Sequence, residues 1–458
     1  MHRRNYLINL SQTSNVIKET AKLCRNSMVI DEFTRRLFGF CHVSAAVIYS
    51  SVTTLLIMRN GISIISGGSV TSPAGFTAGA VSAGIKNSPN ALDLALLVSE
   101  QPAVAAGVFT RNRFRAAPVI LSQRRLRNGR GRAIVVNSGC ANAGTGEIGR
   151  QDADTMTGMA GGLLGFDKSE VMVASTGVIG VTLPMGRVSA GLERITLSQA
   201  GGHDFARAIM TTDSVAKEIA VTVPELGFTV GGCAKGSGMI HPDMATMLAF
   251  ITTDAGVNAN LLKKILRRCV DRSFNLVSVD GDTSTNDSVF IMANGSSGVV
   301  LDTEPGALSL FEEALATVCV FLAKAIARDG EGATRLIELT VTGTDSERDA
   351  RKVVRTVLSS LLVKTAIHGG DPNWGRIVAA AGRSGVPLDL SCVSLDVGGI
   401  VVFDRGQPVP FDEAVAGTVM SRPEIPVRLN LGSGPCTLTG WGCDLSDTYV
   451  HINADYTT

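Results

Sequence analysis

The sequence predicts an α/β protein in which helices and mixed sheets form layers. Short apolar runs of strand length alternate along the chain with longer segments of helical periodicity. The alternation lacks the regular strand–helix–strand rhythm of a doubly wound parallel sheet, which favours mixed layers. With 458 residues, 45% of them hydrophobic and 18% charged, the chain is long enough to bury a sizeable core in two or more lobes.

In the first half of the chain, small and polar residues predict loops at 67–79 and 139–146. Between and after these loops, apolar runs predict four strands, at 132–137, 171–174, 217–223 and 227–231. The last two are close enough to form a hairpin.

In the second half, an apolar run predicts a buried strand at 247–252. Asn258 is a helix N-cap candidate for a helix to about Arg272, whose apolar face would hold Leu262, Ile265, Leu266 and Cys269. A longer, largely buried helix is expected at 306–328. Further strands are expected at 275–280, 288–293, 337–342, 392–397, 426–431 and 449–452.

The N-terminal 57 residues differ from the rest. The segment 37–58 contains no Asp, Glu, Lys or Arg, and its 22 residues are enough to span a membrane. Arg35 and Arg36 precede it and Arg59 follows. This pattern fits a signal anchor, a targeting peptide with a twin-arginine dipeptide, or a start codon placed too early, with Met58 as the natural start.

We favour the early start codon, because the rest of the sequence is organised from shortly after Met58. A mitochondrial presequence is disfavoured by Glu19, Asp31 and Glu32. We therefore treat 1–57 as an extension that is either a mis-called start or a targeting segment. The expected location is the cytoplasm, or the mitochondrial matrix if the extension is a genuine presequence.

Composition argues against several classes of protein. A net charge of +1 and 5% aromatic residues give no reason to expect nucleic-acid binding. The nine cysteines are odd in number and form no C-x-x-C pair, so a disulfide framework is not expected. We therefore expect the protein to work in a reducing compartment. We expect most of them, including Cys140 and Cys233, to be buried packing residues.

The segment 235–248 (KGSGMIHPDMATML) is the most informative in the chain. A Gly-rich loop runs into a turn at Pro242 and then directly into the apolar run 247–251, with Thr246 at the junction. If the chain broke between Ala245 and Thr246, the threonine would gain a free α-amino group with a pKa of roughly 7.7–8.0 beside its own hydroxyl. An N-terminal amine that activates its own threonine hydroxyl is a recognised nucleophile arrangement.

This segment resembles the signature of the ornithine acetyltransferase family, the ArgJ-type glutamate N-acetyltransferases. Other parts of the chain resemble blocks of that family in the same order, and the match spans roughly 65–458. These blocks are 137–143, 175–180, 211–213, 279–287, 329–334, 371–376, 441–444 and 452–458. Each block alone is weak, but their number and order together are specific.

The resemblance implies an α/β sandwich of mixed sheets, shared with the DmpA-type aminopeptidases. It also implies self-cleavage between Ala245 and Thr246 into an α chain, 58–245, and a β chain, 246–458. The family assembles as α2β2, and no membrane association is expected.

The resemblance further implies roles for individual residues. Thr246 is the nucleophile, while Thr176 and Gly177 form the oxyanion hole, where one well-placed donor is worth roughly 2.7–4 kcal/mol. The residues that would bind the amino-acid substrate are Thr211, with Thr212 as the adjacent candidate, Lys235, Thr246, Glu331, Asn453 and Thr458. A lysine suits the substrate carboxylate and a glutamate suits the ornithine ammonium.

The implied reaction is a ping-pong transfer of acetyl from N2-acetyl-L-ornithine to L-glutamate through acetyl-Thr246, in arginine biosynthesis. No cofactor is expected. The family contains enzymes that also take acetyl from acetyl-CoA and enzymes that do not, and no CoA motif decides between them here.

Two alternatives remain open from the sequence. The same scaffold could serve an N-terminal-nucleophile amidase or aminopeptidase, in which water takes the acyl group. The chain could instead be a catalytically inactive protein that binds a ligand or is tethered to a membrane through the segment 37–58. His241, five residues before Thr246, is a candidate base, but we rank it as structural because cleavage would supply an amine.

Two further motifs fail their templates. The segment 280–287 (DGDTSTND) has Thr285 and Ile291 where an EF-hand needs Gly and Glu, so no metal is expected and a polar turn near the active site is predicted. The segment 236–241 has two of the three glycines of a dinucleotide fingerprint and ends at Pro242, which disfavours NAD.

Overall fold

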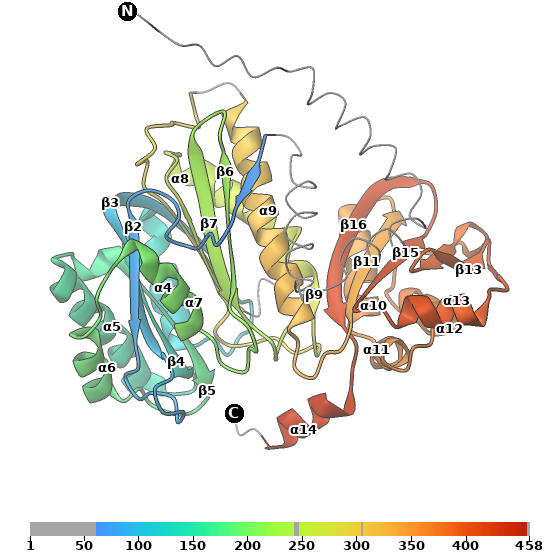
Figure 1. Cartoon of the computed structure of the whole chain (residues 1–458), viewed down its shortest axis with the longest axis horizontal. Helices are drawn as coiled ribbons and strands as arrows, with labels where there is room; N and C mark the ends of the chain where they lie inside the picture. Colours follow the sequence, from blue (N-terminus) through green and yellow to red (C-terminus); the bar gives the residue numbers. More distant parts are fainter. Residues whose placement is uncertain (1–60, 242–246, 304–305, 456–458) are drawn as a thin grey trace, which may run out of the picture. The chain divides into compact units, whose positions relative to one another are not determined.

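The computed structural model describes residues 61–241, 247–303 and 306–455 (Figure 1). Within them, two mixed sheets are covered by helices, which confirms the predicted α/β class. The candidate membrane segment 37–58 lies outside these residues. Among the described helices, none is long and apolar enough to cross a membrane.

The first sheet has nine strands. Eight follow one another in the order β1 (Ser63–Ile65), β6 (Lys217–Val223), β7 (Phe228–Lys235), β8 (Leu248–Thr253), β10 (Ser288–Ala293), β3 (Leu94–Phe109), β4 (Arg130–Cys140) and β5 (Val171–Val178). The ninth, β2 (Phe76–Val81), pairs with β3. The β8–β10 and β4–β5 pairs are parallel and the other pairs are antiparallel.

The second sheet has seven strands. Their order is β14 (Gln407–Pro408), β13 (Ile400–Asp404), β12 (Ser394–Val397), β15 (Glu424–Asn430), β11 (Leu336–Gly343), β16 (Gly434–Cys443) and β9 (Val277–Ser278). The central strand is β15, which runs antiparallel to β12 and parallel to β11. On its other side, β11 pairs antiparallel with β16.

Helices cover both sheets. Around the first sheet lie α4 (Ala117–Arg125), α5 (Gly146–Leu164), α6 (Met185–Leu192), α7 (Gly202–Ala208) and α8 (Ala259–Asp271). The 22-residue α9 (Ala307–Arg328) packs on β6 and β7 of the first sheet and on β16 of the second. The remaining helices are α10 (Glu347–Leu358), α11 (Leu361–His368), α12 (Trp374–Gly382), α13 (Glu413–Met420) and α14 (Asp447–Asp455).

Several sequence predictions are confirmed closely. The side chain of Asn258 accepts a hydrogen bond from the Asn260 amide at 2.9 Å and so caps α8, whose predicted apolar face is buried. The predicted hairpin is β6–β7, and the predicted strands at 247–252 and 288–293 are β8 and β10. The predicted long buried helix is α9.

Other predictions are wrong. The expected strand at 449–452 lies in α14, because its alternating apolar residues have no neighbouring strand to pair with and none of them is buried. Of the expected strand at 275–280, only the two-residue β9 forms, and it pairs with β16. The loop expected at 67–79 ends earlier, because β2 begins at Phe76.

Candidate active site

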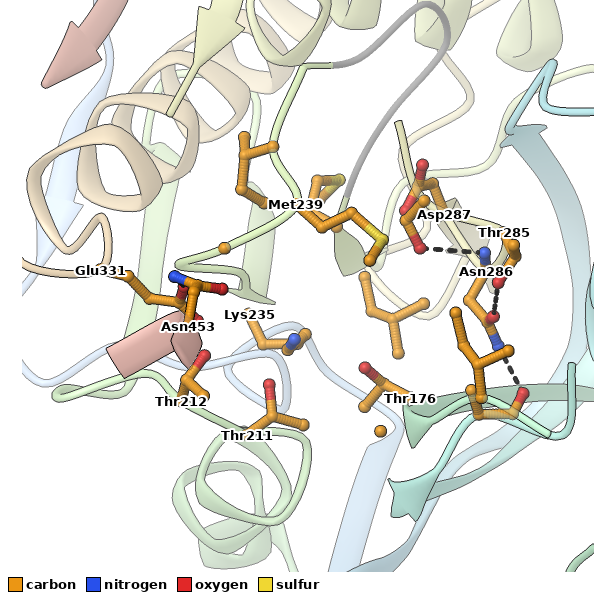
Figure 2. A pocket seen from close by; sticks show the side chains of 18 residues that line it. Thr176, Thr211, Thr212, Lys235, Met239, Thr285, Asn286, Asp287, Glu331 and Asn453 are labelled. Carbon is orange, nitrogen blue, oxygen red and sulfur yellow. Dashed lines mark hydrogen bonds between the residues drawn. The ribbon is translucent and has the colours of Figure 1, made fainter. Parts of the chain in front are cut away.

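A pocket with about 780 Å³ of empty space, part of it open to solvent, lies where strands of the first sheet end (Figure 2). Its walls come from the C-terminal ends of β5 and β7, the start of β8, the segment before β10, and α14. Its lining residues are Ala141, Thr176, Gly177, Ile179, Thr211, Thr212, Lys235, Gly238, Met239, Ile240, Met247, Leu248, Ser284, Thr285, Asn286, Asp287, Glu331 and Asn453.

The pocket brings together seven of the residues that the sequence singled out, Thr212 as the adjacent candidate to Thr211 and six others. The six others are Thr176, Gly177, Thr211, Lys235, Glu331 and Asn453, which come from five separate segments of the chain. Ala245, Thr246 and Thr458 lie outside the described residues. Met247, which follows Thr246 in the sequence, lines the pocket.

Gly177 occupies a position that only glycine fits. It lies in β5 beside Gly139 of β4, with a φ of 130°. A Cβ atom built there would lie 2.3 Å from the Gly139 carbonyl carbon and 2.5 Å from the Cys140 nitrogen. The sequence predicted a strand that ends at 174, whereas the structure continues β5 through Thr176 and Gly177, so the sheet itself fixes this wall.

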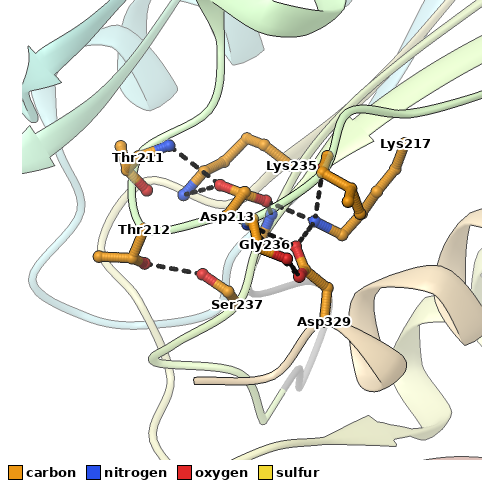
Figure 3. A network of polar contacts seen from close by, with 10 residues as sticks. Thr211, Thr212, Asp213, Lys217, Lys235, Gly236, Ser237 and Asp329 are labelled. Carbon is orange, nitrogen blue, oxygen red and sulfur yellow. Dashed lines mark hydrogen bonds and ion pairs between the residues drawn. The ribbon is translucent and has the colours of Figure 1, made fainter. Parts of the chain in front are cut away.

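Lys235 is the buried cation of the pocket. Its side chain is 11% exposed, and its ammonium lies 4.0 Å from the carboxylate of Asp213, which is fully buried. Asp213 also accepts hydrogen bonds from Lys217 Nζ at 2.7 Å and from the amides of Gly236 at 2.6 Å and Thr211 at 3.0 Å (Figure 3). One carboxylate therefore ties together two residues of the pocket wall, Thr211 and Lys235.

The network extends to a second carboxylate. Lys217 Nζ lies 2.5 Å from Asp329, so two lysines and two aspartates balance their charges in the buried region. Burial would raise the pKa of Asp213, but Lys235, Lys217 and the Gly236 amide outweigh it and lower that pKa to about 2. Burial lowers the pKa of Lys235, partly opposed by the charge of Asp213.

Glu331 and Asn453 form the acidic side of the pocket. Asn453 Nδ2 donates to Glu331 Oε2 at 2.9 Å, and the Glu331 amide donates to the Ser237 carbonyl at 2.8 Å. Gly238 leaves room for the carboxylate, because a Cβ there would lie 2.4 Å from its atoms. The α14 helix thus brings Asn453 to Glu331, which the wrong strand prediction for this segment could not show.

The polar segment 280–287 shapes the pocket, as the sequence predicted for this turn. Asp280 accepts hydrogen bonds from the amides of Met239 and Ile240 and holds the Gly-rich loop where Met239 has a φ of 56°. Burial raises the pKa of Asp280. Asn286 Nδ2 donates to the carbonyls of Ala141 at 2.6 Å and Ser175 at 2.8 Å.

Sequence reasoning missed the pocket residues Met239, Ile240 and Asn286. The available signal for Asn286 was the polar run 280–287. Asn286 is buried, and a buried amide side chain needs hydrogen-bond partners, so it holds the neighbouring loops in place. His241 Nδ1 lies 3.0 Å from Ser278 Oγ, and His241 is not among the described residues that line the pocket. Its ranking as structural stays a prediction.

The described residues contain no group of three or more His, Cys, Asp or Glu side chains arranged to hold a metal ion. All seven described cysteines are free, and Cys140 and Cys233 are buried in the core, as expected of packing residues.

Comparison with known proteins decides the family. The sequence model of the ArgJ family matches residues 77–458. The chain belongs to the ArgJ family. Its ArgJ relatives include the arginine biosynthesis bifunctional protein ArgJ of Dehalococcoides mccartyi, which is 52% identical over 405 residues, covering 88% of this chain and all of that protein.

A second ArgJ relative, the bifunctional protein of Thermosynechococcus vestitus, is 52% identical over 412 residues, 85% of this chain and 98% of its own. Among solved structures, the bifunctional ArgJ protein of Bacillus halodurans is 42% identical to this chain. The match covers 46% of this chain and 100% of the solved chain, with a TM-score of 0.45.

Proposed function

We propose that this ArgJ-family protein is a glutamate N-acetyltransferase that moves acetyl from N2-acetyl-L-ornithine to L-glutamate in arginine biosynthesis. One observation carries the proposal. A single pocket holds Thr176 and Gly177, the proposed oxyanion pair, together with Lys235 and Glu331, and Met247, the residue after Thr246, lies in its wall. The names of the relatives, arginine biosynthesis bifunctional proteins, support it.

The proposed nucleophile is made by self-cleavage. The Thr246 hydroxyl attacks the Ala245 carbonyl carbon, the peptide C–N bond breaks, and the acyl group moves to the oxygen. Water then hydrolyses this ester and leaves Thr246 with a free amine that serves as its base. The products are an α chain ending at Ala245 and a β chain beginning at Thr246, and we propose that they assemble as α2β2.

Acetyl transfer then follows in two halves. The Thr246 oxygen attacks the acetyl carbonyl of N2-acetyl-L-ornithine, the amide C–N bond breaks, and ornithine leaves with the proton taken from the hydroxyl. Glutamate enters the same pocket and its amine attacks the ester carbonyl. The C–O bond to Thr246 breaks, the threonine oxygen regains a proton from the amine, and N-acetylglutamate leaves. Thr176 and Gly177 would stabilise the negative oxygen that forms in each half, which is the usual contribution of preorganised donors.

The polar groups of the pocket suit an acetylated amino acid with a basic side chain. Lys235 and the Thr211 hydroxyl would bind the α-carboxylate, and Glu331, held by Asn453, would bind the ornithine ammonium. Thr458 would complete the substrate contacts. A buried lysine–aspartate network fixes the cation before substrate enters, so little reorganisation is needed.

A second acetyl donor is included in the proposal. The relatives are named bifunctional, and acetyl-CoA as a co-substrate would supply acetyl to the same Thr246 for glutamate, with no other cofactor required. We place the enzyme in the cytoplasm.

Covalent trapping tests this function. The protein is incubated with acetylornithine in the absence of glutamate, digested, and its peptides are analysed by mass spectrometry. The proposal predicts an acetyl group on Thr246 that disappears when glutamate is added, with N-acetylglutamate as the product. An unmodified Thr246 peptide, or rapid release of acetate without any need for glutamate, would indicate a different enzyme such as a hydrolase.

A further inference from the structure

A second cavity, which we call the basic groove, lies between the loop after β3 and helix α8. It has about 1480 Å³ of empty space, part of it open to solvent. Six of its thirteen lining residues are Arg or Lys and none is Asp or Glu. The six cations are Arg111, Arg113, Arg115, Lys263, Lys264 and Arg267, and all are exposed.

This concentration of positive charge is unusual for the chain. Its net charge is only +1, yet no Asp or Glu occurs between Gln101 and Gly146, a stretch that contains eight arginines. Cations gathered on one concave surface raise the local concentration of anions. The cations come from two elements far apart in sequence, so the charge is gathered by the fold.

The basic groove adjoins the candidate active site. The Thr110 amide donates to the Asp287 carbonyl at 3.0 Å and the Thr110 hydroxyl donates to the Ser284 carbonyl at 3.0 Å. Asn112 Nδ2 donates to the Thr283 carbonyl at 2.9 Å. Thr110 and Asn112 line the groove, whereas Ser284 and Asp287 line the pocket, so these two segments form a wall between the two cavities.

We propose that the basic groove binds the phosphate groups of acetyl-CoA and so directs its thioester to the adjoining pocket. Arginines bind phosphate oxygens through paired N–H donors and lysines act as compact charges. The inference rests on the proposed function, because Thr246 must receive the acetyl group.

The chemical step keeps the same nucleophile. The Thr246 oxygen attacks the thioester carbonyl, the C–S bond breaks, and the CoA thiol leaves with the hydroxyl proton. Acetylornithine carries no phosphate, so its binding does not depend on the cations of the basic groove. The two donors should therefore respond differently to loss of its charges.

The test uses a groove variant, Lys263→Gln, Lys264→Gln, Arg267→Gln. These side chains lie on the exposed face of α8, so the buried face of the helix is unchanged. The control variant, Arg405→Gln, Arg422→Gln, Arg428→Gln, removes the same charge from exposed positions around the second sheet. For each protein, the KM for acetyl-CoA and the KM for acetylornithine are measured with glutamate as the acceptor.

The groove variant should raise the KM for acetyl-CoA about tenfold or more, as expected when several charge-assisted hydrogen bonds are lost, and leave the KM for acetylornithine within about twofold. The control variant should change neither. An equal rise for both donors in the groove variant, or no rise for acetyl-CoA, would overturn the proposal.

Binding of adenosine 3′,5′-bisphosphate, followed by calorimetry, provides a readout that does not need catalysis. The wild type should bind it more tightly than inorganic pyrophosphate, and the groove variant more weakly than the wild type. Equal affinity for pyrophosphate, or tighter binding of a short RNA, would contradict a nucleotide-thioester site.

The two proposals can fail separately. A wild-type protein that transfers acetyl from acetylornithine but neither uses acetyl-CoA nor binds the bisphosphate would overturn the groove proposal alone. A protein that binds the bisphosphate but acetylates glutamate from neither donor would contradict the proposed function.

Discussion

The buried carboxylate of Asp213 lies 4.0 Å from the ammonium of Lys235, at the wall of the candidate active site. The same carboxylate accepts hydrogen bonds from Lys217 and from the amides of Thr211 and Gly236. Asp213 does not line the pocket, yet it fixes two residues that do. Both the stability of this region and the charge of Lys235 should therefore depend on Asp213.

Replacing Asp213 by Asn should strongly destabilise the protein. The change removes the negative charge that neutralises the buried ammonium groups of Lys217 and Lys235. Removing one partner of a buried ion pair costs about 3–5 kcal/mol. Urea unfolding measures this as a lower midpoint. Asp204→Asn, which removes the partner of exposed Arg207, is the control and should cost less than about 1 kcal/mol. Equal effects of the two changes would contradict the assigned network.

Acid should weaken the fold through the same carboxylate. The pKa of Asp213 is about 2 in the folded protein against 3.8 in the free side chain, so its contribution is complete above about pH 4 and is lost as the pH falls through 2. The expected loss is about 2 kcal/mol. Unfolding midpoints of the wild type should fall over this range, and those of Asp213→Asn should fall less. Parallel curves would argue against a lowered pKa.

Glu331→Gln should weaken binding of the basic donor. The change keeps the shape and the contact with Asn453 but removes the negative charge that faces the pocket. Loss of a charged hydrogen bond predicts a KM for acetylornithine that is about tenfold or more higher. Steady-state kinetics with Glu193→Gln, an exposed position outside the pocket, provide the comparison. An unchanged KM would remove Glu331 from the substrate site.

Gly177→Ala should abolish activity and impair folding. Its Cβ would lie 2.3 Å from the Gly139 carbonyl carbon, and its φ of 130° disfavours any side chain. The control is Gly162→Ala in α5, where a Cβ meets nothing within 4 Å and should stabilise the helix by about 0.5–1 kcal/mol. Thermal unfolding and the acetyl-transfer assay of both proteins check the contrast. An active, stable Gly177→Ala protein would contradict this packing.

The elements that the sequence predicted best are those whose signals are local. The cap at Asn258 and the apolar face that ends at Cys269 define α8 without reference to the rest of the chain. The strand β10 was likewise bounded by polar residues on one side and glycine on the other. Its partners were not predictable, because pairing with β3 and β8 depends on segments distant in the sequence.

For the candidate site, too, local features were predictable from the sequence and long-range contacts were not. The residue types of Thr176, Lys235 and Glu331 were identified from motifs, but only the fold shows that they face one pocket. The network at Asp213 depends on Lys217 and Asp329, which are 112 residues apart and carry no joint signal in one sequence. The helix α14 was mistaken for a strand because short apolar alternation favours β-structure unless the missing partner strand is known.

Intact mass spectrometry of the purified protein, alongside a Thr246→Ala variant, tests the central claim most directly. The account predicts two fragments for the wild type, the second beginning at Thr246, and one uncleaved chain for the variant. A single intact wild-type chain would leave Thr246 without its free amine and would contradict the proposed nucleophile.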